Sequence, residues 1–542
     1  MEDAARNLAY CLTEDKTKYF WETAELETFL TARGFDFSKK NLATLLTVLA
    51  ENDIFRWLSF VGAKLPEAAS ESDEFLNLLL LVIKKVKGDL AQGPLIRGMI
   101  NIGTTNPKLA NMLFDSIVST KEENMVLYSG LVLGGVGKKE PDNVLDRITE
   151  NIKTESPYLR AAYIKALRVM FEDSQLVQGE RVFEILRSAA SPRENGLVRS
   201  EAANAFIDFY KFNPSFCYNQ ILDLAKQGDS KIRLVIAQRL WFGSLKPKPN
   251  IMSILKECAQ DDSPETLSAV SWALSNQGKE YPRETLNIVR QWIRRRKYFE
   301  IREIDFLLSE IGKANTAKCI EIIMSWIKNT KDTILMAAIP SLLVSVSSSN
   351  REILLDYLKA FLTSPNKIFP ILASRTIGDI IVDLHATPSM ETVRKCFGLA
   401  KILAKMDEMQ EEVSMLFHNT FSAKPRFATS DDLVEITQDW VSDENWKIRR
   451  AITWALGPIA EDKLDVRETL EVRLNTATGK TEIFNIKVEE ITKPEGEKAY
   501  DFLVALTKDS NSIVAKESRT ILEEVDKRLT QKKQSLDQRT KP

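Results

Sequence analysis

The densest group of side chains able to bind a charged partner is the run RQWIRRRKYFEIRE at residues 290–303. Clustered guanidinium groups pair with phosphates or carboxylates through parallel hydrogen bonds, and neighbouring aromatic rings stack on bases. Charge runs mostly form solvated surfaces, so a basic turn paired with nearby acids is the favoured interpretation; an acidic protein and a nucleic acid are the functional alternatives. The candidate binding residues are Arg290, Arg294, Arg295, Arg296, Lys297, Tyr298 and Arg302.

A second group combines tryptophans with adjacent arginines in DWVSDENWKIRRAITWALG, residues 439–457. This string supplies a secondary candidate cluster, made of Trp440, Trp446, Arg449 and Arg450.

Motifs for common enzyme chemistry are missing from the sequence. It has no GxxxxGK[ST], GxSxG or HExxH motif, and its two histidines, His385 and His418, are interpreted as structural or surface residues. The glycine-rich stretch at 130–137 lies within a predicted helix and indicates close helix packing. The five cysteines form no CxxC pair: Cys11, Cys217, Cys258, Cys319 and Cys396. We therefore predict a non-enzymatic protein with no catalytic residue, no metal site and no cofactor.

The overall charge gives no preference for a polyanion. The 542 residues include 74 Lys and Arg against 76 Asp and Glu, for a net charge of -2, so any binding of nucleic acid has to be local. Scattered cysteines and an N-terminus without a basic start or apolar core predict a cytoplasmic protein. The longest apolar stretch, at 75–87, is interrupted by charge and too short to span a membrane.

A short phrase that recurs along the chain predicts the elements that position these residues. Examples are LRAAYIKAL at 159–167, VRSEAANAF at 198–206, IRLVIAQRL at 232–240 and IRRAITWAL at 448–456. The recurrence has a period of about 34 residues, and each copy carries apolar residues at helical spacing. Trp292 aligns with Trp326 of the following unit and is therefore expected in the core. Such a period is typical of stacked repeats.

A second phrase precedes the first in several units, for example ILDLAK at 221–226 and IIMSWI at 322–327. Two phrases that share one period predict a helix pair in each unit. A polar turn, often with Asp, separates them, as in QGDSK at 227–231 and NTKDT at 329–333, and it is expected to cap the second helix. On these residues the chain resembles the HEAT-repeat family. The resemblance implies an all-α fold, an α-solenoid of about 11 stacked antiparallel helix pairs.

Departures from the period define the expected domain organisation. Residues 1–92 have helical patterns without a clean period and are expected to form an irregular N-terminal cap, followed by a repeat array at 93–428 and C-terminal repeats at 429–530. The segment 469–490 alternates about an ATGK turn and predicts an inserted β-hairpin. The polar tail at 531–542 is expected to be disordered.

Two further resemblances define alternatives for function. The string at 439–457 is similar to a motif of the HEAT-like alkylpurine DNA glycosylases, which implies nucleic-acid binding and DNA repair; bilin lyases also contain HEAT-like units, an analogy of fold alone. Repeat arrays usually bind partners through distributed contacts. We therefore expect a non-catalytic scaffold or adaptor that offers its concave face to a protein partner, with nucleic acid as a minor alternative.

Overall fold

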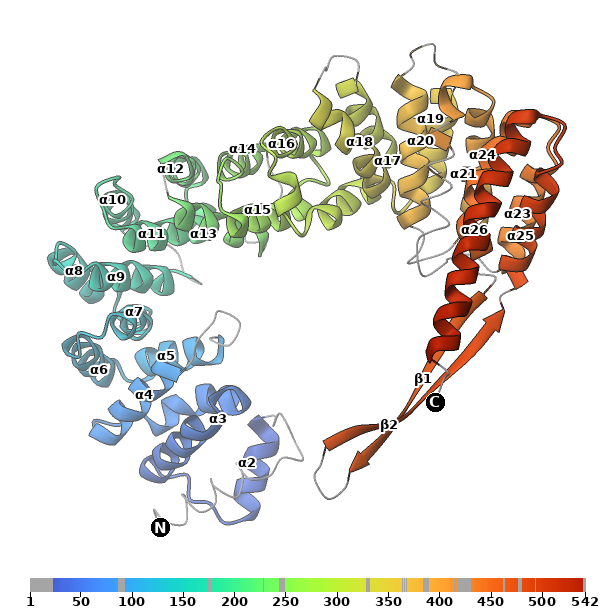
Figure 1. Cartoon of the computed structure of the whole chain (residues 1–542). Helices are drawn as coiled ribbons and strands as arrows, with labels where there is room; N and C mark the ends of the chain where they lie inside the picture. The colour runs from blue at the N-terminus through green and yellow to red at the C-terminus, as the bar shows by residue number, and fades with distance from the viewer. Residues whose placement is uncertain are drawn as a thin grey trace. The chain divides into compact units, whose positions relative to one another are not determined.

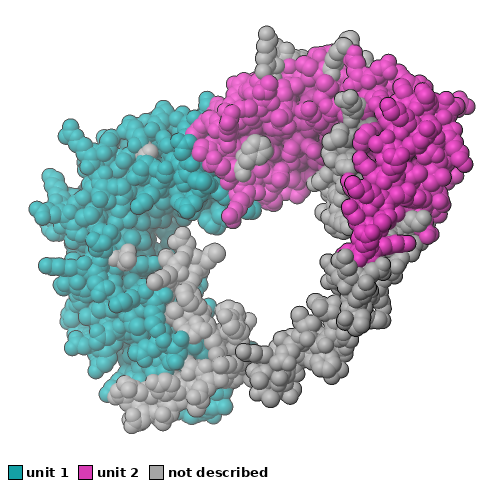
Figure 2. Space-filling model, in the orientation of Figure 1, with its two compact units in different colours: residues 1–277 teal, residues 278–542 magenta. Residues whose placement is uncertain are grey.

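The computed structural model describes residues 23–85, 93–172, 178–227, 229–242, 249–327, 332–362, 364, 366, 368–383, 389–410, 412–413, 416, 430–461, 464–475, 480–492 and 494–539. The chain divides into two compact units, residues 1–277 and residues 278–542 (Figure 2). The regular structure of the described residues is helical apart from one pair of strands.

Unit 1 is built from two layers of helices (Figure 1). In the second-helix layer each member packs against the next: α3 (Lys39–Ala68), α5 (Gly93–Thr105), α7 (Glu123–Gly137), α9 (Pro157–Met170), α11 (Gly196–Asp208), α13 (Ser230–Trp241) and α15 (Pro264–Gln277). The first-helix layer contains α4 (Asp73–Lys85), α6 (Pro107–Ser119), α8 (Pro141–Asn151), α10 (Gly179–Ala189), α12 (Pro214–Gln227) and α14 (Pro249–Cys258). Helix α2 (Thr23–Ala32) packs on α3, and a short helix η1 (Phe209–Lys211) follows α11. The predicted helix pair per repeat is confirmed.

The turns between paired helices use the aspartates that the sequence places there. Asp229 Oδ1 accepts a hydrogen bond from the N–H of Ile232 at 3.1 Å, and Asp332 Oδ1 accepts from Ile334 and Leu335 at 3.1 and 3.2 Å. Such bonds satisfy backbone donors that the first turn of a helix leaves unpaired. The predicted N-caps are confirmed at these two turns.

The arginine of the recurring phrase joins successive repeats. Arg160 donates to Glu194 at 2.7 Å, and Arg233 donates to Asp261 at 3.2 Å. Each of these two arginines also donates a hydrogen bond to a backbone carbonyl of its own repeat, as Arg233 does to Ala225 O at 2.8 Å. We call them, together with Arg449 of unit 2, the inter-repeat arginines.

Helix α7 approaches both neighbours closely because of its glycines. A Cβ atom at Gly135 would collide with the carbonyl oxygen of Ile100 in α5, and one at Gly130 would collide with that of Ala162 in α9. A side chain at either position would force the helix axes apart. Close helix packing at residues 130–137, expected from the sequence, is confirmed.

Unit 2 continues the helix pairs. Its helices are α16 (Pro282–Arg294), α17 (Ile304–Ile327), α18 (Thr333–Val346), α19 (Arg351–Leu362), α20 (Ile368–Asp383), α21 (Met390–Ala404), α23 (Ser430–Val441), α24 (Trp446–Ala460), α25 (Pro494–Leu506) and α26 (Ser512–Arg539), with short helices η2 (Tyr298–Glu300) and η3 (Asp407–Met409). Asn315 has non-helical dihedrals, φ -154° and ψ 50°, and divides α17 into the second helix of one repeat and the first helix of the next.

Two antiparallel strands lie between α24 and α25, in the segment for which the sequence predicts a hairpin. Strand β1 (Leu464–Asn475) pairs with β2 (Lys480–Thr492), from Leu464 opposite Thr492 to Asn475 opposite Lys480, with one irregularity between Glu471 and Val472. The paired strands are longer than the predicted range 469–490. The connecting residues 476–479 lie outside the described part of the chain.

The C-terminal tail differs from the disorder expected at 531–542. Helix α26 continues to Arg539, and Lys532 Nζ donates to Glu461 O at 2.7 Å, close to an ion pair between Arg528 and Glu461. Gln, Lys, Leu and Arg favour helix, and no Gly or Pro interrupts the sequence before Pro542. An established helix is therefore extended at little cost by residues too polar to start one.

Candidate functional site

The basic run at 290–303 is distributed around the end of α16 and does not form one patch. Arg295 closes the helix, and Arg296 follows it with a φ of 59°, the left-handed conformation that commonly ends a helix. Arg294 pairs with Asp332 at 3.5 Å, and Lys297 pairs with Glu300 at 3.1 Å. The positive charges of Arg294 and Lys297 are thus compensated by neighbouring acids.

Two further residues of the run lie in opposite environments. Tyr298 is 5% exposed, and burial, followed by the charge of Asp305, raises the pKa of its phenol to about 12. Its ring therefore belongs to the core. Arg302 is exposed and forms no ion pair or hydrogen bond within the residues that the structure describes.

The secondary cluster is used inside unit 2. Trp440 is 1% exposed and packs edge-on against Phe397 at 6.4 Å. Arg449 donates to both carboxylate oxygens of Asp509 at 2.6 and 2.9 Å, and Arg450 binds Glu517 through bonds of 2.8 to 3.0 Å. The charges of both arginines are thus compensated, while Trp446 is half-buried at the start of α24.

Two adjoining hollows lie mainly on the first helices of successive repeats, and Arg290 lines one of them. The basic hollow lies between α16 and the second half of α17, has a volume of about 340 Å³, and is lined chiefly by Arg283, Asn287, Arg290, Lys318, Glu321 and Trp326. The aromatic hollow lies between α17, α19 and the start of α20 and has a volume of about 370 Å³. It is lined chiefly by Glu321, Met324, Tyr357, Ala360, Phe361 and Phe369. Glu321 and Ser325 line both, so the hollows form one groove.

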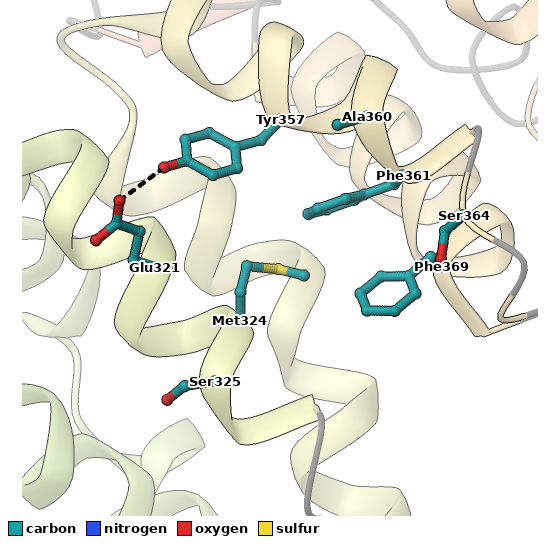
Figure 3. A pocket seen from close by; sticks show the side chains of 8 residues that line it. All are labelled: Glu321, Met324, Ser325, Tyr357, Ala360, Phe361, Ser364 and Phe369. Carbon is teal, nitrogen blue, oxygen red and sulfur yellow. Dashed lines mark hydrogen bonds between the residues drawn. The ribbon is translucent and has the colours of Figure 1, made fainter.

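Figure 3 shows how the walls of the aromatic hollow are arranged. Met324 points from α17 toward Phe361 and Phe369, whose ring centroids are 5.3 Å apart. The hydroxyl of Tyr357 donates to Glu321 at 3.2 Å at the other end of the hollow. The site thus offers sulfur and aromatic surfaces to an apolar side chain, with one polar contact at its border with the basic hollow.

The basic hollow carries an excess of positive charge. Arg283 and Lys318 are exposed, and neither side chain forms an ion pair or hydrogen bond within the described residues. The guanidinium group of Arg290 lies over the buried Trp326, 5.5 Å from the ring centroid. Its buried Nε–H has no hydrogen-bond partner among the described residues. Burial and the charge of Arg294 lower the pKa of Arg290, against the opposing effect of Asp332. An anionic group placed here would gain attraction from three cations.

Comparisons with known proteins found similarity only to solved structures. No protein-family model matches the chain, and no curated protein matches it. It is similar to Kap121p bound to Ste12p (11% identity, TM-score 0.44) and to Kap121p bound to Nup53p (12%, 0.43), each match covering 99% of this chain and 55% of that chain. It is also similar to a chain in a homology model of the full-length AP-3 complex (12%, 0.35), covering 98% of this chain and 96% of that chain. The chain spans about half the length of the Kap121p structures.

The paired helices and their capped turns decide the architecture. The chain has a HEAT-like fold. Its HEAT-like repeats continue on both sides of the division at residue 277, with second helices that begin at the polar turns. No helix of the described residues is long and apolar enough to cross a membrane.

The cysteine thiols are the nucleophilic side chains to consider for catalysis within the described HEAT-like repeats. Burial raises the pKa of Cys217, Cys258 and Cys396 to about 12 and that of Cys319 to about 11, so these thiols are protonated at neutral pH. Among the described residues no group of three or more His, Cys, Asp or Glu side chains could hold a metal ion. His385, His418 and Cys11 lie outside the described residues.

Sequence reasoning found Arg290 and missed the other lining residues of the groove. Arg283, Asn287 and Arg290 follow one another at steps of four and three, which places them on one face of a helix. That spacing was available in the sequence. The aromatic hollow had no comparable signal, because Phe361 and Phe369 occupy apolar positions typical of any repeat core.

Proposed function

We propose that this chain is a non-catalytic protein-interaction scaffold and that one of its contact surfaces is the groove on the first helices of unit 2. The observation that supports the proposal is the adjacency of the basic and aromatic hollows, which share Glu321 and Ser325. Protein interfaces combine a few buried aromatic anchors with charged residues at the margin. The groove provides both on neighbouring helices.

The mixture of side chains favours a protein over a nucleic acid. A phosphate backbone is bound by cations spread along its track, whereas in the groove a carboxylate and a wall of Met324 and aromatic rings lie next to the cations. Arg449 and Arg450, the other residues expected to meet a polyanion, are paired with Asp509 and Glu517. These observations favour a protein partner over the nucleic-acid alternative.

The test is affinity capture with a groove variant. Three chains are expressed at equal levels in the native cells: the wild type, the double variant Arg283→Glu and Lys318→Glu, and the control Arg302→Glu. Each is recovered after crosslinking and nuclease treatment. We expect a protein that is recovered with the wild type and the control and is lost with the double variant. Recovery of the same proteins with all three chains, or of this chain alone, contradicts the proposal.

A further inference from the structure

The two hollows of the groove differ in the chemistry that they accept. The aromatic hollow presents Met324 and the adjacent rings of Phe361 and Phe369 (Figure 3), so it fits a large apolar side chain. Placing such a side chain against these rings removes apolar surface from water on both molecules. The polar groups of this hollow, Glu321 and the hydroxyl of Tyr357, already bond to each other.

The basic hollow accepts a carboxylate. Arg283 and Lys318 have no acidic partner within the described residues, and Arg290 has a buried Nε–H without an acceptor there. Glu321 is the one acid among the lining residues of this hollow, and its carboxylate accepts from Tyr357 on the side of the aromatic hollow. The cations are therefore in excess. A bound carboxylate would supply the missing charge and the missing acceptor.

The distance between the hollows determines the spacing of the two groups that occupy them. One hollow lies between α16 and α17 and the other between α17 and α19, so their centres are separated by about one interaxial distance, roughly 10 Å. A segment in the polyproline II conformation advances about 3.1 Å per residue and has three residues per turn, so every third side chain lies on the same side. Two side chains that enter both hollows from such a segment are therefore about three positions apart.

We propose that the groove binds a segment of a partner protein in the polyproline II conformation, in which an Asp or Glu and a large apolar residue, aromatic or leucine, stand three positions apart, with the carboxylate beside Arg283, Arg290 and Lys318 and the apolar side chain against Met324, Phe361 and Phe369. This inference rests on the proposed scaffold function and specifies the segment that one of its partners presents. The charge complementarity of the basic hollow commits the site to an acidic segment.

The first experiment is selection of a random peptide library, displayed on phage, against the full chain. We expect enriched peptides to share an acidic and a large apolar residue at the stated spacing, in either order along the peptide. Enrichment without an acidic position, or with no fixed spacing between the two, overturns the proposal. An absence of enriched peptides also overturns it.

The second experiment measures affinities of a selected peptide by fluorescence polarisation. The double variant Arg283→Glu and Lys318→Glu should weaken binding by about tenfold or more. The control Arg302→Glu should not, because Arg302 is also exposed but lies outside the groove. Raising the salt from about 0.05 M to about 0.5 M should weaken binding to the wild type. Equal binding by the double variant overturns the proposal, and its exposed substitutions leave the fold intact, which circular dichroism verifies.

The aromatic hollow is tested with a second pair of variants. Phe369→Ala should weaken binding of the same peptide roughly tenfold, whereas Phe306→Ala, at an aromatic residue of α17 that is 44% exposed and does not line the groove, should have no effect. If no peptide is enriched but the capture experiment still loses a protein with the double variant, the acidic segment is rejected and the scaffold function stands. If peptides bind as expected but capture recovers no partner, the scaffold function is rejected.

Discussion

The inter-repeat arginines and the cations of the groove are the same kinds of side chain in two different settings. Arg449 faces Asp509, and Arg233 faces Asp261, with the acids nearly inaccessible to solvent. Arg283 and Lys318 are exposed and face no acid among the described residues. The paired arginines connect one repeat to the next through ion pairs. The unpaired cations of the groove can still attract the negative charge of a partner. Positive charge in this array is therefore available to a partner only where the neighbouring repeat does not compensate it.

The largest effect is expected from breaking an inter-repeat pair. Arg449→Met should destabilise the packing of α24 and α26 by about 3 kcal/mol, because it leaves the carboxylate of Asp509, 6% exposed, without its cation. Hydrogen exchange under native conditions measures the effect as faster exchange of amides in these helices. The control Arg302→Met should change stability by no more than about 0.5 kcal/mol. Unchanged protection in Arg449→Met would remove the distinction between the two settings.

Lowering the pH should also destabilise the inter-repeat pair of Arg449 and Asp509. The hydrogen bonds from Arg449 lower the pKa of Asp509 in the folded protein. The unfolded chain therefore takes up this proton first as the pH falls. The stabilisation is complete well above the ordinary carboxyl value of about 3.9, decreases as the pH falls below it, and is lost below the lowered pKa of the folded state. Thermal unfolding across this acidic range measures the decrease.

The matched variant for this prediction is Asp509→Asn. It removes the titrating group and keeps an acceptor for the N–H of Asn511, which bonds to Asp509 at 2.7 Å. Its stability should be lower than that of the wild type at neutral pH and should fall less steeply in acid. A pH profile identical to that of the wild type would show that this pair contributes nothing to the acid response.

The sequence predicted the inter-repeat features because each depends on local spacing. The recurring arginine and the aspartate of the turn repeat at one period, so the helix pairs and caps followed from residues such as Asp229 and Arg233. Tyr298 shows where local spacing fails. Its neighbours Arg296 and Lys297 suggested a surface, but the chain turns after α16 and carries the ring into the core.

The groove depends on contacts between repeats, which no local pattern contains. Its lining residues come from α16, α17, α19, the start of α20 and the turn between the last two helices. Which cations stay uncompensated depends on whether the adjacent helix places an acid within reach. Arg294 and Arg290 lie one helical turn apart, yet Arg294 pairs with Asp332 while Arg290 lies over Trp326. The sequence alone treats these two arginines as equivalent.

A smaller effect on stability is expected from the groove. Replacing Arg283 and Lys318 by Met should change the free energy of unfolding by no more than about 0.5 kcal/mol per site, because neither side chain has a partner to lose within the described residues. The same variant should bind a selected acidic peptide less tightly. Thermal unfolding and fluorescence polarisation on one preparation separate the two quantities. Loss of stability comparable to that of Arg449→Met would place these cations with the inter-repeat arginines.

The smallest effect is expected at the border between the two hollows. Tyr357→Phe removes the hydrogen bond to Glu321 and leaves that carboxylate free to compete with a bound acid for the cations. An exposed bond of this kind has a small energy, so binding of the acidic peptide should weaken by about twofold with stability nearly unchanged. Tyr500→Phe removes a similar bond, to Asp526 at 2.8 Å, away from the groove and should leave binding unaltered. Tighter binding by Tyr357→Phe would mean that the hydroxyl obstructs the groove and that Glu321 does not compete with the ligand.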